Sequence, residues 1–80
     1  MDQVAAKHVC KVAFECMKRI NETIEFVRHN GDEETFLVVR DGLLETIATI
    51  GREMINPMTN RFPDLEREIS ESIEKYGMLI

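Results

Sequence analysis

Two long segments of this chain each carry an apolar face that is too wide for a single helical neighbour. With a rotation of about 100° per residue, most apolar residues of 4–27 fall on one arc of a helix or on its flanks, and those of 36–55 fill about half of a second circumference. A helix that packs against one neighbour needs only a narrow seam. Each segment therefore predicts a helix with at least two neighbours.

The central positions of the two arcs are the predicted core and dimer-interface residues. They are Val9, Ala13, Cys16, Ile20, Ile24 and Val27 on the first helix, and Phe36, Leu43, Ile47, Ile50 and Met54 on the second. A lone hairpin leaves part of both arcs exposed to water. We therefore expect an all-α fold in which a helical hairpin and a short third helix pair with a second copy, giving a dimeric four-helix-type bundle with twofold symmetry.

The chain is predicted to form one helical domain over residues 1–80, since 80 residues suffice for a single core at most. The first helix spans about 2–29, and Asn30-Gly31 is expected to end it in a left-handed conformation. Asp32 is the predicted N-cap of the second helix, which spans about 33–56. This arrangement predicts a tight antiparallel corner. Asn-Gly is also a common β-hairpin turn, and that alternative is less favoured because the preceding residues keep a helical period.

Two prolines set the remaining boundaries. Pro57 disfavours a helical conformation at the residue before it, so we expect a loop over 57–62. Pro63 suits the first turn of a third helix over about 63–76, which Gly77 ends. The narrow apolar stripe of this helix predicts a cover that packs through one face.

The net charge of −5 lies entirely in the second part of the chain, because residues 1–30 are almost balanced. Such an acidic protein gains little from counterion release on a polyphosphate, so nucleic acid is not an expected partner. The lysines of the first helix alternate with glutamates along one face, which predicts a solvated, ion-paired surface.

The two cysteines are expected to stay reduced. Cys10 and Cys16 are separated by roughly 9 Å of helical rise, beyond the reach of a disulfide, which suits a cytoplasmic protein. Cys16 lies near the middle of the apolar arc and is predicted to be buried, while Cys10 lies at its edge and is predicted to be more accessible. No signal peptide or membrane-spanning segment is expected, and no membrane partner.

No constellation of residues points to catalysis, a metal or a cofactor. His8 and Cys10 are two residues apart on a helix, so their side chains point in different directions and cannot act as a ligand or catalytic pair. We therefore expect that the protein is not an enzyme. Three side chains stand out as possible partner or anion contacts: Arg40 within the second apolar arc, and Phe14 and Phe26 on either side of the first.

Two functions follow from these observations. The first is a small protein–protein interaction or regulatory module that acts as a homodimer and binds an unidentified protein. The alternative is an acidic inhibitor that mimics nucleic acid and presents the carboxylates of the second half to a basic protein surface.

Overall fold

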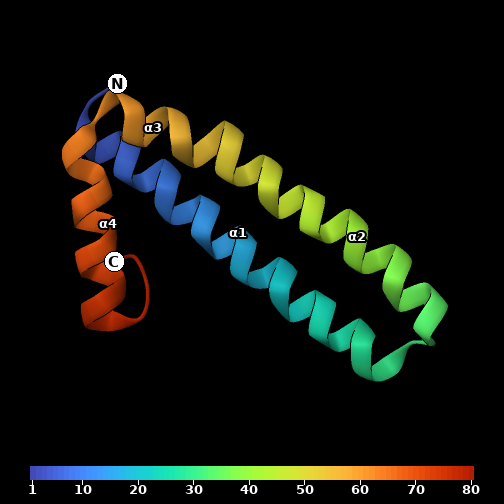
Figure 1. Ribbon diagram of the computed structural model, residues 1–80. Coiled ribbons are helices and arrows are strands. Elements are labelled where there is room, and N and C mark those ends of the chain that lie inside the picture. Colours follow the sequence, from blue (N-terminus) through green and yellow to red (C-terminus); the bar gives the residue numbers. More distant parts are fainter.

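The computed structural model describes all residues, 1–80, and contains helices and no strand. Two long helical rods run antiparallel, and a shorter helix crosses the end where the chain begins (Figure 1). The elements in order are α1 (Gln3–Asn30), α2 (Glu33–Ile50), the π-helix η1 (Gly51–Ile55), α3 (Asn56–Arg61) and α4 (Pro63–Tyr76). The all-α class and the hairpin with a third helix are therefore confirmed.

The corner between α1 and α2 is formed by hydrogen bonds that cap the two helices. The Asp32 carboxylate accepts a bond from the Thr35 backbone N–H at 2.8 Å and one from the Thr35 hydroxyl at 3.0 Å, as expected of an N-cap. The predicted left-handed stop is wrong, because Gly31 has an extended backbone with φ −113°. Instead, the Gly31 N–H reaches the Val27 carbonyl at 2.9 Å, and the Asn30 amide donates to the Phe26 carbonyl.

The predicted loop over 57–62 is also wrong, since the second rod continues as helix through Pro57 to Arg61. Asn56, directly before the proline, has helical torsions (φ −57°, ψ −43°). A proline ring normally clashes with the carbonyl four residues earlier. The wide turn of η1 relieves this crowding, because its bonds run five residues back, as from Asn56 N–H to the Gly51 carbonyl.

The third helix has the predicted limits. α4 begins at Pro63 and ends at Tyr76, where Gly77 adopts the left-handed conformation with φ +74°. Only Phe62 separates α3 from α4. Its torsions (φ −125°, ψ 82°) are not helical, so the direction of the chain changes at this residue. α4 therefore folds back against the first part of α1 (Figure 1).

Asp32 gives the corner a measurable dependence on pH. The hydrogen bond from the Thr35 backbone lowers the pKa of Asp32 below its usual value. Its stabilisation is therefore present at neutral pH and is lost as the pH falls through this lowered pKa. We expect Asp32→Ala to lower the Tm at pH 7, and the difference from wild type to shrink in acid. Asp32→Asn, which keeps an acceptor, should retain most of the Tm; equal losses in both variants would contradict this role.

Candidate functional site

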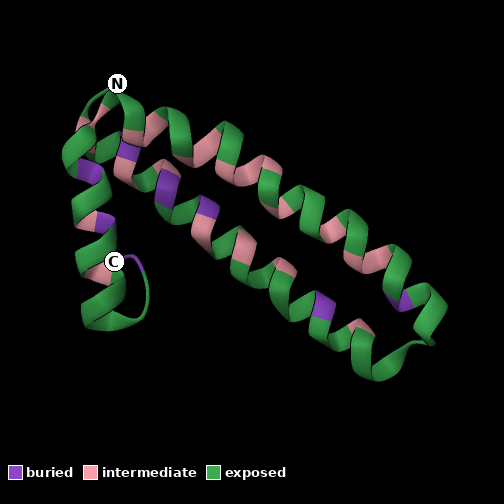
Figure 2. Cartoon of the chain, in the orientation of Figure 1, coloured by how far each residue is buried: buried purple, intermediate pink, exposed green.

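The seam between α1 and α2 contains most of the predicted core residues, but it buries few of them fully. Ala13, Ile24 and Phe36 are buried, as predicted. The other aliphatic side chains of the seam remain half-buried in the single chain: Val9, Ile20, Val27, Leu43, Ile47, Ile50 and Met54. Figure 2 shows the segments of intermediate burial in pink, as a broken line along both rods with exposed segments in green between them.

The fully buried core lies at the other end of the molecule from the corner, where α4 crosses α1. It consists of Ala6, Cys10, Leu65, Ile69 and Leu79, with Phe14, Ile55, Met58 and Phe62 packed around them. Most residues of this cluster are not among the core positions predicted from the sequence. A signal was present in the small side chains of Ala6 and Cys10, which are four residues apart and therefore lie on one side of α1.

The predicted environments of the two cysteines are reversed. Cys10 is buried under α4, and Cys16 is exposed. Six residues along a helix correspond to a rotation of about 240°, so the two thiols cannot both face the same neighbour. Burial raises the pKa of the Cys10 thiol, which makes it still less reactive.

Arg40 finds its partners within its own chain. Its guanidinium lies 3.1 Å from the Asp41 carboxylate and 5.8 Å from the centre of the Phe36 ring. These contacts explain how a charged side chain is accommodated on the apolar arc of α2. Gly51 also lies on this rod, and no side chain or other helix comes within 4 Å of the position a Cβ would take, so it mediates no close helix contact here.

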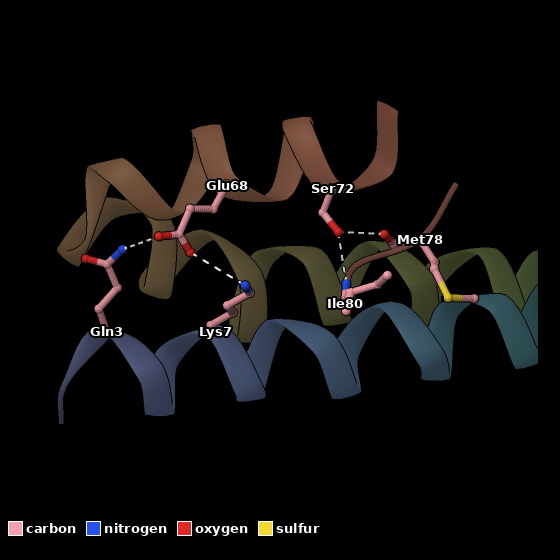
Figure 3. A network of polar contacts seen from close by, with 6 residues as sticks. All are labelled: Gln3, Lys7, Glu68, Ser72, Met78 and Ile80. Atoms are coloured by element: carbon pink, nitrogen blue, oxygen red, sulfur yellow. Dashed lines mark hydrogen bonds and ion pairs between the residues drawn. The ribbon is translucent and has the colours of Figure 1, made fainter. Parts of the chain in front are cut away.

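The chain after α4 folds back along that helix. The Ser72 hydroxyl donates to the Met78 carbonyl at 2.7 Å and accepts from the Ile80 N–H at 2.9 Å (Figure 3). This turn places Leu79 in the core. In the first half of α4, Glu68 accepts a bond from the Gln3 side chain at 3.0 Å and lies 3.9 Å from the Lys7 amine. α4 is thus fastened to α1 by polar contacts near its start and by its folded-back tail.

An open groove lies between α1 and this tail, with a volume of about 1040 Å³. We call it the tail groove. Its apolar lining comes from Phe14 and Met17 of α1, Ile73 of α4, and the tail residues Met78, Leu79 and Ile80. Its polar lining lies on α1 and consists of Lys11, Glu15, Lys18, Asn21, Glu22 and Glu25. Of the predicted contact residues, Phe14 therefore belongs to this groove, whereas Phe26 and Arg40 do not.

Comparison of the chain with protein-family models, curated proteins and solved structures finds no match. None of the helices has the length and apolar character needed to cross a membrane. No group of three or more His, Cys, Asp or Glu side chains is arranged to hold a metal ion. The tail groove and the half-buried seam are therefore the features from which a function can be argued.

The reversed cysteines can be tested by alkylation of the native protein with iodoacetamide. We expect Cys16 to react readily and Cys10 to react at least about a hundredfold more slowly, because its thiol is exposed only when α4 opens. Peptide mass spectrometry would measure both rates. Both cysteines should react together in denaturant, and equal rates without denaturant would contradict the position of α4.

The folded-back tail gives a second test. Ser72→Ala removes both tail hydrogen bonds and should lower the free energy of unfolding by about 1 kcal/mol. Leu79→Ala should cost more, about 2 kcal/mol, because it leaves a cavity in the core. Ser70→Ala is the matched control on the exposed side of α4 and should change the stability by less than about 0.5 kcal/mol. Urea denaturation would compare the three, and equal effects of Ser72→Ala and Ser70→Ala would refute the tail's role.

Proposed function

We propose that this chain is a small, non-enzymatic protein–protein interaction module that acts as a homodimer. The observation that carries the proposal is the excess of exposed surface. The single chain exposes 5716 Å². A compact monomer of this mass exposes about 5000 Å². The excess of about 700 Å² is close to the roughly 800 Å² that each partner buries in a standard interface.

The shape of the chain supports the same proposal. Its radius of gyration is 14.7 Å, and its extents are 45 × 25 × 15 Å. A compact domain of this length has a radius of about 12 Å. Only eight of the 80 residues are buried, so most of the apolar surface that the two rods carry is incompletely covered. A second copy that packs on one broad side of the hairpin would cover it and give a thicker, more compact particle.

We propose no catalytic activity because the two ionisable groups with shifted pKa values already have structural roles. Cys10 and Asp32 have shifted pKa values, but Cys10 belongs to the core and Asp32 caps α2. Perturbed groups of this kind point to catalysis when they converge in a cleft. Here each one has a structural explanation of its own.

A protein partner is proposed to bind the end of the hairpin near the corner. Phe26 on α1 is 66% exposed, and Val38 on α2 is 71% exposed. Each of these large apolar side chains is available for contact with another protein. A twofold dimer would present this end twice.

The acidic-inhibitor alternative receives less support from the arrangement of the carboxylates. Glu33 and Glu34 lie in the first turn of α2 at the corner, while the other acidic group lies on α4 at the opposite end of the hairpin (Figure 1). On α4, Glu68 and Glu71 are already engaged with Lys7 and Arg67. This alternative predicts binding to a basic protein that weakens steeply as the salt concentration rises.

The homodimer can be tested by thermal unfolding at different protein concentrations. If folding and association are linked, the Tm should rise by about 5 °C for each tenfold increase in concentration. Ile20→Asp and Leu43→Asp, which place a carboxylate in the half-buried seam, should dissociate and unfold the protein together. Val38→Asp is the exposed control and should behave as wild type. A Tm independent of concentration, or a stable folded monomer of either seam variant, would contradict the proposal.

A further inference from the structure

We propose that the tail groove is the homodimer interface and that α1 of the second copy lies in it, antiparallel to α1 of the first. This inference rests on the homodimer proposed above and specifies its orientation. The occupant is inferred from three features: the apolar lining of the groove, the order of unpaired charges along its edge, and the position of α4.

The floor of the groove carries apolar side chains that the single chain leaves in water. Met78 and Ile80 are 52% and 54% exposed, although both are next to the buried Leu79. Phe14 and Met17 line the opposite wall on α1 and are only half-buried. A helix is about 10 Å wide, and its apolar side would contact both walls at once. Burial of these side chains is the main source of affinity.

The edge of the groove carries charges in a self-complementary order. Lys11, Glu15, Lys18 and Glu22 are separated by four, three and four residues, so they form one line along α1. An antiparallel copy presents the same line in reverse. Lys11 then faces Glu22 of the partner, and Lys18 faces Glu15 of the partner. The twofold axis crosses α1 at the level of Cys16 and Met17, and all four contacts join opposite charges. A parallel copy in register would place like charges together.

These charges are largely free to bind a partner. None of the seven ion pairs of the chain involves Lys11, Glu15 or Lys18, and Glu22 contacts only Arg19, at 3.4 Å. The sequence led us to expect a solvated face with ion pairs along the helix. The structure instead leaves three of its four charges unpaired.

The position of α4 fits this arrangement. α4 covers Ala6 and Cys10, so the first turns of α1 are already occupied. The residues of α1 that line the groove begin at Lys11 and extend to Glu25. Because an antiparallel partner is centred between residues 16 and 17, the open stretches of the two α1 helices share residues 11–22. The two α4 helices then lie at opposite ends of the shared interface.

Charge reversal tests the orientation directly. Lys11→Glu/Lys18→Glu makes the edge wholly acidic, and Glu15→Lys/Glu22→Lys makes it wholly basic. Each variant alone should dimerise about tenfold to a hundredfold more weakly than wild type, because all four contacts become repulsive. An equimolar mixture of the two should form a heterodimer, since every contact is then attractive. Light scattering would give the masses, and circular dichroism would report the helix content.

The matched control is Arg52→Glu/Arg67→Glu, which changes the net charge equally at residues outside the groove and should dimerise as wild type. A fourth variant reverses all four charges within one chain and keeps the composition. It should form homodimers but exchange with isotope-labelled wild type to give fewer mixed dimers than a random distribution, as measured by native mass spectrometry. This exchange experiment still tests the orientation of the dimer if one of the double variants fails to fold.

Each remaining outcome is also decisive. A dimeric wild type whose double variants dimerise normally, or whose mixture does not recover, would overturn the antiparallel groove interface and leave the proposed homodimer intact. Random exchange between the fourth variant and wild type would likewise overturn the antiparallel interface without contradicting the homodimer. A wild-type protein that stays monomeric would overturn both.

Discussion

The structure depends on a geometrical limit: two helices in one layer can cover only one side of each other. The seam between α1 and α2 buries Ala13, Ile24 and Phe36, but its other aliphatic residues stay half-buried. α4 supplies the third neighbour for the first turns of α1 only, where Ala6 and Cys10 are buried with Leu65 and Ile69. The complete core is therefore concentrated at one end, and the rest of the hairpin needs a further neighbour.

The local polar contacts of the chain determine where this neighbour can bind. Glu68 fastens the start of α4 to α1, and Ser72 folds the tail back so that Leu79 reaches the core. These contacts hold the tail away from the middle of α1 and create the tail groove. The same fold that stabilises one end of the molecule thus leaves a groove with apolar and charged lining beside it. This groove is the basis of the proposed orientation of the dimer, whereas the homodimer itself is inferred from the excess of exposed surface.

Much of the fold could be predicted from the sequence, because capping residues and the apolar period act locally. Asp32, Pro63 and Gly77 marked helix limits that the structure confirms. The path through Pro57 could not be predicted by the same rules, since a π-turn upstream removes the clash that normally ends a helix at proline. The reversed burial of Cys10 and Cys16 could not be predicted either. It depends on tertiary packing, because the position of α4 determines which side of α1 is covered. The tail groove required both α4 and the fold-back at Ser72, which no periodicity indicates.

Sedimentation equilibrium of the unmodified protein over a range of micromolar concentrations tests the central claim most directly. The account predicts a mass of two chains that falls toward one chain on dilution, with loss of helix content in parallel. A mass of one chain at every concentration, in a protein that remains helical and melts cooperatively, would contradict it.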